Sequence, residues 1–162
     1  MDSIYPQTET INTTNEPDPQ LLAQQSSGAK WFYWIAALSL INSAIFAFGG
    51  NVSFILGLAV TQVVDGLFEV AISSGAPTAI KAIAVVIDLA IAAMFALFGY
   101  YANKGMALAF IIGIVIYVFD GLVYLAVGDM LAAGFHVFAL FFIIRGFLAS
   151  RKLAAAAKYQ PV

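Results

Sequence analysis

The stretch Leu108-Ala-Phe-Ile-Ile-Gly-Ile-Val-Ile-Tyr-Val-Phe-Asp-Gly-Leu-Val-Tyr-Leu-Ala-Val127 decides the fold class of this chain. Its length of about 20 residues, at ~1.5 Å each, matches the ~30 Å hydrocarbon core of a bilayer. Asp120 is the only charged residue in it. A shorter stretch, Ile55-Leu-Gly-Leu-Ala-Val-Thr-Gln-Val-Val-Asp-Gly-Leu67, repeats the pattern of an early glycine followed by Asp-Gly-Leu. The repetition predicts that Asp65 and Asp120 stand on equivalent helices of a duplicated membrane bundle.

The composition supports a membrane protein and excludes several classes of site. Of 162 residues, 62% are hydrophobic and 10% are charged, so a soluble fold of this size could not hide its apolar surface. The nearly balanced charge argues against binding to nucleic acid. The absence of cysteine excludes disulfides and thiolate metal sites, and a single histidine excludes a multi-histidine site within one chain. We expect no metal and no cofactor.

Turn residues divide the apolar region, residues 30–152, into five predicted helices near residues 31–48, 52–73, 78–101, 106–127 and 130–150. Residues 1–29 are polar and contain prolines, which predicts a disordered tail, and residues 153–162 form a short basic tail. The first two helices pair with the next two as a duplicated hairpin, and one helix follows. The fold class is therefore an all-α polytopic membrane bundle of about five spans. The alternative is four spans plus a re-entrant or interfacial helix at 52–73, because that segment is polar along one side.

The charges predict an orientation in a cell membrane. Lys104 and the basic C-terminus fall on the same side, which the positive-inside rule assigns to the cytoplasm. Five spans then put the N-terminus outside, whereas four spans put both termini inside.

Ionisable side chains gather at similar depths in the predicted helices. Asp65, Asp120 and His136 lie ~10–12 Å from the outer turns and Asp88 lies ~16 Å from them. Because a carboxylate facing lipid costs several kcal/mol, these groups must face the bundle, water or a partner. They predict a proton or cation site, with the aspartates supplying oxygens and the histidine exchanging the proton. The same helix stripes carry the polar side chains of Gln62, Tyr117 and Tyr124, which we include in the site.

Two further groups of polar residues have structural interpretations. Glu69 and Lys81 face each other across the turn at residues 73–77, which predicts an ion pair at the mouth of that hairpin. Ser39, Asn42 and Ser43 form a narrow polar stripe on the first helix, and such stripes are typical of close helix packing.

These patterns allow three classes of function. The first is a transporter or channel protomer for a proton, a cation or a small solute, working in the bilayer as a homo-oligomer or with a membrane partner. The second is a scaffold or accessory subunit whose polar residues hold helices or a partner together. The third is an intramembrane enzyme or a binder of a lipophilic ligand. No phosphate-binding loop, His-Glu-x-x-His or Gly-x-Ser-x-Gly motif is present, so we assign no catalytic residue.

Overall fold

The computed structural model describes residues 16–48 and 57–158, and this part of the chain is helical throughout apart from its turns. It contains α1 (Pro19–Ala47), α2 (Ala59–Ser73), the short 3-10 helix η1 (Thr78–Ile80), α3 (Lys81–Asn103), α4 (Ala107–Ala126) and α5 (Met130–Lys158). The all-α prediction is confirmed. Four segments are long and apolar enough to cross a membrane, namely α1, η1 with α3, α4 and α5.

The second helix is the one that differs from the five-span prediction. It was expected over residues 52–73, but it begins at Ala59 and has 15 residues, and residues 52–56 lie outside the described part. Its length of ~22 Å is shorter than the ~30 Å hydrocarbon core. No local side chain caps its first turn. The start of α2 is therefore set by contacts with other helices.

The first and last helices are longer than predicted. α1 begins at Pro19 rather than near residue 31, so residues 19–29 of the predicted disordered tail are helical. Asp18 caps this helix by accepting a hydrogen bond from the Gln20 amide (2.8 Å), and proline fits a first helical position. α5 continues to Lys158 through a run of alanines, the strongest helix formers. Residues 1–15 and 159–162 lie outside the described part.

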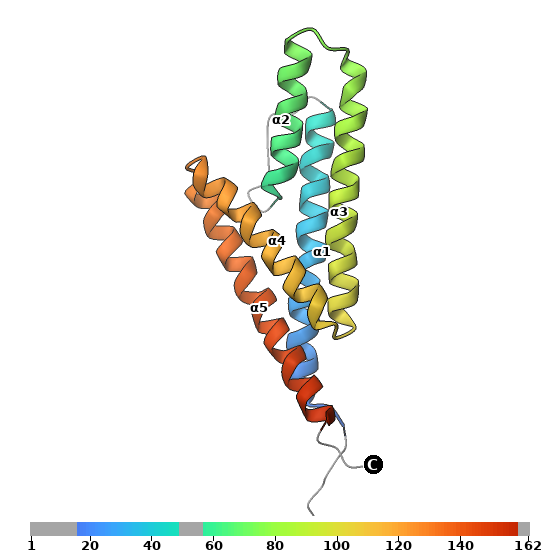
Figure 1. Cartoon of the computed structure of the whole chain (residues 1–162), viewed down its shortest axis with the longest axis vertical. Helices are drawn as coiled ribbons and strands as arrows, with labels where there is room; N and C mark the ends of the chain where they lie inside the picture. Colours follow the sequence, from blue (N-terminus) through green and yellow to red (C-terminus); the bar gives the residue numbers. More distant parts are fainter. Residues whose placement is uncertain (1–15, 49–56, 159–162) are drawn as a thin grey trace, which may run out of the picture.

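Figure 1 shows how the helices are arranged. α1 runs along the molecule, α3 runs back beside it, and α4 and α5 form a hairpin that leans against the first half of α1. The start of α1 and the end of α5 lie at the same end of the molecule. α2 begins midway along the bundle and runs in the same direction as α1. The predicted first hairpin is therefore unlike α3 and α4, which run in opposite directions.

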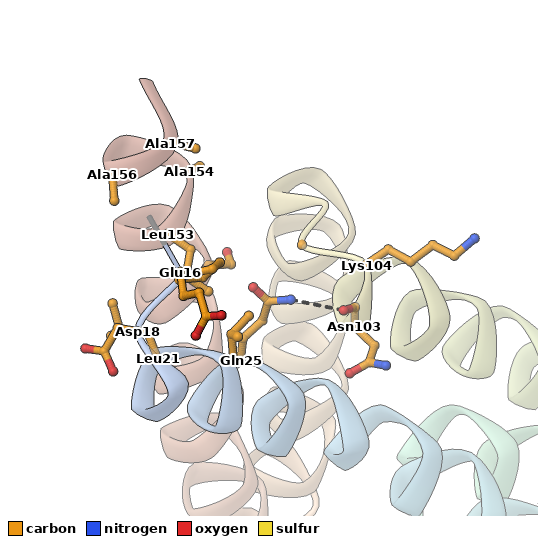
Figure 2. Close-up of a pocket in the computed structure, with 14 residues that line it drawn as sticks. Glu16, Asp18, Leu21, Gln25, Asn103, Lys104, Leu153, Ala154, Ala156 and Ala157 are labelled. Atoms are coloured by element: carbon orange, nitrogen blue, oxygen red, sulfur yellow. Dashed lines mark hydrogen bonds between the residues drawn. The ribbon is translucent and has the colours of Figure 1, made fainter. Parts of the chain in front are cut away.

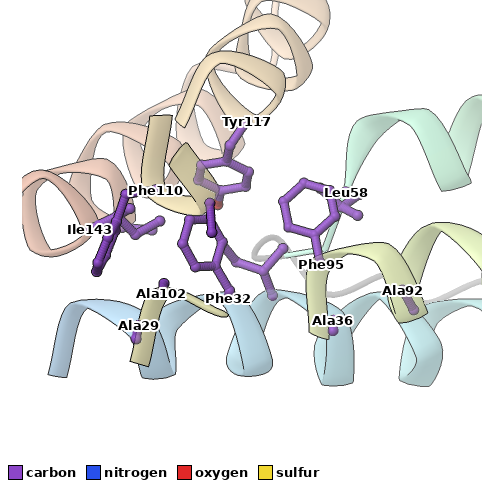
Figure 3. Packing of buried hydrophobic residues seen from close by; sticks show 13 residues of the cluster. Ala29, Phe32, Ala36, Leu58, Ala92, Phe95, Ala102, Phe110, Tyr117 and Ile143 are labelled. Carbon is purple, nitrogen blue, oxygen red and sulfur yellow. The ribbon is translucent and has the colours of Figure 1, made fainter. Parts of the chain in front are cut away.

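The core is a cluster of aromatic rings surrounded by small residues (Figure 3). The Phe32 ring lies at the centre, 6.3 Å from the Phe95 ring and 6.1 Å from the Phe110 ring. Gly113 makes this possible, because a Cβ atom there would lie 2.5 Å from the Phe32 ring. Many large apolar side chains point outward instead, among them Trp34, Phe119 and Val137. This distribution is consistent with a helical bundle in a membrane.

Helices α1 and α5 approach each other closely at two glycines, Gly28 and Gly146. A Cβ atom on Gly28 would lie 2.6 Å from the Gly146 Cα atom and 2.8 Å from the Phe142 carbonyl oxygen, which are both backbone positions. A side chain there would force the two helices apart. Glycine pairs of this kind let helix backbones approach closely in membranes.

We expect Gly28→Ala to lower the free energy of unfolding by ~1–3 kcal/mol, the usual cost of overpacking. The measurement is thermal unfolding of the purified protein in detergent. Gly134→Ala is the matched control, because a Cβ atom at that position on α5 meets nothing within 4 Å. The control is expected to leave the melting temperature unchanged or to raise it, since alanine favours helix. Equal melting temperatures for both variants would contradict the close-packing interpretation.

Candidate functional site

The start of α2 lies inside the bundle and is held by side chains from two other helices. The amide of Leu58 donates to Ser39 Oγ (2.9 Å) on α1. The amides of Ala59 and Val60 donate to the two carboxyl oxygens of Asp120 on α4, at 2.8 and 2.9 Å. The first amides of a helix have no partner within the helix, and a carboxylate is favoured at that end by the helix dipole. Asp120 therefore caps α2 from a distance in sequence of about sixty residues.

His136 on α5 completes this arrangement. Its Nε2 atom lies 2.9 Å from Asp120 Oδ2 and its Nδ1 atom lies 2.9 Å from the Ala132 carbonyl oxygen. Because a carbonyl oxygen only accepts, Nδ1 carries a hydrogen. The contact with Asp120 requires one more proton, carried either by Nε2 or by the carboxyl group. The pair thus holds one shared proton, and both of its side chains are buried.

Tyrosine rings surround His136 and add a further contact to α2. The Tyr117 ring stacks on the imidazole with centroids 4.3 Å apart, and the Tyr124 ring lies at 5.0 Å. Tyr124 Oη accepts a hydrogen bond from Gln62 Nε2 (2.7 Å) and donates to the Gly57 carbonyl (3.2 Å). Five of the predicted site residues meet here, namely Gln62, Tyr117, Asp120, Tyr124 and His136. We call this group the α2 anchor.

A second group lies further along α2. Asp65 of α2 and Asp88 of α3 are buried and face each other, and Ser43 of α1 lies beside Asp88. Asp88 interacts with the side chains of both Ser43 and Asp65, whereas no described residue outside these three makes a hydrogen bond to Ser43 Oγ, to Asp65 Oδ1 or to either oxygen of Asp88. Tyr117 Oη in the anchor likewise has no such partner among the described residues. We call Ser43, Asp65 and Asp88 the acidic cluster.

The predicted single layer of ionisable groups is thus two groups in the structure. Asp65 follows Ala59 by six residues, or ~9 Å along α2, so it lies well beyond the helix start that Asp120 caps. His136 bonds to Asp120, not to the other two aspartates. The depth estimate counted residues from the outer turns as if those turns lay at one level, whereas the turn between α2 and α3 lies further along the molecule than the turn between α4 and α5 (Figure 1).

The predicted ion pair at the hairpin between α2 and α3 is present. Lys81 Nζ lies 3.3 Å from Glu69 Oε2 and 4.9 Å from the centre of the Phe46 ring. Both side chains are partly exposed, so the pair contributes little to stability. Its contact with Phe46 joins the hairpin to the end of α1.

The structure has two further concave regions away from the anchor and the acidic cluster. An open pocket of about 660 Å³ lies between the start of α1, the turn after α3 and the end of α5 (Figure 2). Its polar wall includes Gln25, whose Nε2 atom donates to the Asn103 carbonyl (3.0 Å). A groove of about 260 Å³ on the outer face of α4 and α5 reaches His136, and its other lining residues are apolar or glycine. The first lining includes Glu16, Asp18 and Ser150, whereas His136 is the only ionisable residue in the second.

Sequence reasoning missed two contributors to these groups. Ser39 and Ser43 were interpreted as helix-packing residues, yet one accepts from the start of α2 and the other lies in the acidic cluster. The position of both serines on one stripe of α1 could have indicated that they face other polar groups. Nothing in the sequence indicated that the backbone amides at the start of α2 would be bound by Asp120 and Ser39. Among the described residues, no three histidine, cysteine, aspartate or glutamate side chains gather as a metal site.

Comparisons of the chain with protein-family models, with curated proteins and with solved structures find no match. The functional argument therefore rests on the residues themselves.

We expect Asp120→Ala to lower the free energy of unfolding by ~3–5 kcal/mol, the cost of removing one partner from a buried ion pair. The substitution leaves two α2 amides and His136 without an acceptor. Thermal unfolding in detergent measures the loss, and Asp120→Asn should fall between the alanine variant and the wild type because one acceptor remains.

Asp129→Ala is the comparison variant. Asp129 accepts from the Ala132 amide (3.0 Å) and is exposed, so it acts as an ordinary helix cap worth ~1 kcal/mol. If Asp120→Ala melted no earlier than Asp129→Ala, Asp120 would not be the residue that holds α2.

Proposed function

We propose that this chain is a small integral membrane protein that moves a proton, a cation or a small solute across the bilayer, as a channel or transporter protomer. The observation that carries the proposal is the burial of two carboxyl groups, Asp65 and Asp88, in the acidic cluster. The start of α2 supports it, because this helix begins inside the bundle with its amides turned toward α1 and α4. Irregular backbone at membrane depth is tolerated only where it is buried in protein or lines a water-filled cavity. Helices that begin inside the membrane are a recurring feature of binding sites in transporters.

The acidic cluster supports the same function. It places two buried carboxyl groups on α2 and α3 that interact with each other, and no described residue outside the cluster donates to Asp65 Oδ1 or to either Asp88 oxygen. Buried ionisable side chains in membrane helices are costly and mark ion or proton pathways. The α2 anchor has the opposite character, because Asp120 and His136 pair with each other and with backbone groups. We therefore assign transport to the acidic cluster and a structural role to the anchor.

We further propose that the protein has four spans, with α2 as a re-entrant helix. This is the alternative topology, and it places both termini on one side. Lys104, Arg151, Lys152 and Lys158 lie at that end, and the positive-inside rule assigns it to the cytoplasm. Lys104 Nζ donates to Tyr100 Oη (2.6 Å), and this hydrogen bond raises the pKa of the ammonium group, which stays charged.

The scaffold alternative is favoured by one observation, the pairing of Asp120 with His136 and with the first amides of α2. If the acidic cluster also served only to hold helices together, its carboxyl groups would be paired in the same way. A homo-oligomer, or a complex with another membrane protein, remains part of both proposals.

The four-span topology predicts that residues 16 and 157 are on the same side of the membrane. The chain has no cysteine, so single variants Glu16→Cys, Ala157→Cys and Asp129→Cys can be labelled in sealed vesicles with a membrane-impermeant maleimide. We expect the first two to show the same accessibility and Asp129→Cys the opposite one. Opposite accessibility of residues 16 and 157 would restore the five-span topology, which puts the N-terminus outside.

The transport proposal predicts proton or cation flux in liposomes that depends on the acidic cluster. Asp65→Asn and Asp88→Asn should each reduce flux at least about tenfold, since a carboxylate in a low-dielectric site stabilises a cation by more than the ~1.4 kcal/mol that this factor represents. Glu16→Gln, an exposed carboxyl at the cytoplasmic end, is the control and should conduct like the wild type.

Thermal stability is recorded for each variant beside its flux. Flux that disappears while the melting temperature is kept supports transport. An inactive wild type, together with variants that melt early or dissociate, would favour the scaffold.

A further inference from the structure

The acidic cluster is built by one side chain from each of three helices. Ser43, Asp65 and Asp88 are 4%, 5% and 1% exposed, and they come from α1, α2 and α3. Ser43 Oγ and both Asp88 oxygens have no hydrogen bond to any described residue outside the cluster. A buried hydroxyl and a buried carboxyl whose only partners are the other members of the cluster are expensive in a folded protein. Such groups indicate a ligand that supplies the missing interactions.

The charge of the cluster shows what kind of ligand is needed. Two ionised carboxylates facing each other among apolar helices repel each other and lose their hydration. Lys81, the basic side chain that acts on Asp65, is already paired with Glu69 at 3.3 Å. The cluster therefore requires one positive charge between its carboxyl groups, either a proton that they share or a bound cation.

The donor atoms narrow the choice of cation. All of the atoms in the cluster that lack a partner outside it are oxygens, from two carboxyl groups and one hydroxyl. Oxygen-only sites suit hard ions such as alkali and alkaline-earth cations, whereas softer transition metals prefer nitrogen or sulfur. A monovalent ion carries the same charge as the shared proton, so one can replace the other without a change in the net charge of the bundle.

We infer that Ser43, Asp65 and Asp88 form a binding site for one Na⁺ ion, which competes with the proton that Asp65 and Asp88 otherwise share. The inference rests on the proposed function and names its transported species, an alkali cation or the proton that it displaces. The α2 anchor is excluded as this site, because both Asp120 oxygens already accept amide hydrogens from α2. A cation there would compete with the start of the helix.

Binding is tested on the purified full-length protein in detergent, without any flux measurement. Thermal unfolding is followed in NaCl and in N-methylglucamine chloride at equal ionic strength. We expect Na⁺ to raise the melting temperature of the wild type, on the order of 5 °C at a hundredfold excess over its dissociation constant. In weakly buffered solution with a pH indicator, the same titration should release up to about one proton per protein.

Variants show whether the ion binds where we infer. Asp88→Asn and Asp65→Asn should lose both the thermal shift and the proton release, and Ser43→Ala should require a higher Na⁺ concentration for the same shift. Glu16→Gln is the matched control and should behave like the wild type, because Glu16 lies at the opposite end of the bundle from the turn between α2 and α3. If an aspartate variant fails to fold, Ser43→Ala and the proton release of the wild type still decide the question.

Several results would overturn the inference. The site is absent if the folded wild type shows neither a Na⁺-dependent shift of its melting temperature nor proton release. It is also rejected if Asp88→Asn keeps the Na⁺-dependent shift. A response to CaCl₂ with none to NaCl would also overturn it, since the site would then take a divalent ion. The flux test is separate: Na⁺ binding without flux would keep the site and reject transport, whereas flux without Na⁺ binding would keep transport and reject the site.

Discussion

The capping of α2 by Asp120 is the interaction on which the rest of the structure depends. A helix that begins inside a bundle has amides that water cannot reach, and each unsatisfied buried group is costly. The Asp120 carboxylate satisfies two of these amides and Ser39 satisfies a third. The carboxylate in turn needs a compensating charge or proton in an apolar bundle, and His136 provides it. Four helices are therefore tied to one point, which explains why a short helix can keep a fixed position.

The two groups of carboxyl residues show how environment divides the roles of one residue type. Asp120 accepts from two α2 amides and shares a proton with His136. Asp88 is as deeply buried, but in the described structure neither of its oxygens has a partner outside the acidic cluster. A satisfied buried charge stabilises a particular packing, whereas an unsatisfied one is retained where a ligand or a proton supplies what is missing. The number of partners that each carboxyl group has thus distinguishes the anchor from the candidate ion site.

Much of the fold could be predicted from composition and periodicity, because the physical requirement of a bilayer is strong. The predicted bounds of the helices that became α3 and α4, and of the turns around them, lie within a few residues of the observed ones. The predicted ion pair of Glu69 and Lys81 is also present. The start of α2 could not be predicted. Residues 52–58 continue an apolar pattern, and Asp120, which caps the first turn of α2, lies far away in the sequence. Gly28 was likewise assigned to a polar tail, because its partner Gly146 is on another helix.

The position of α2 also links the two groups. The helix is fixed at its first turn by Asp120, and its only aspartate, Asp65, lies ~9 Å further along the same rigid element. Any rotation or shift of α2 at the anchor must therefore move Asp65 relative to Asp88, which is held on α3. The single proton shared by Asp120 and His136 is needed for the anchor, because without it a carboxylate oxygen and a bare imidazole nitrogen would face each other. The geometry of the candidate ion site thus depends on a proton held at the other group, through a helix that belongs to both.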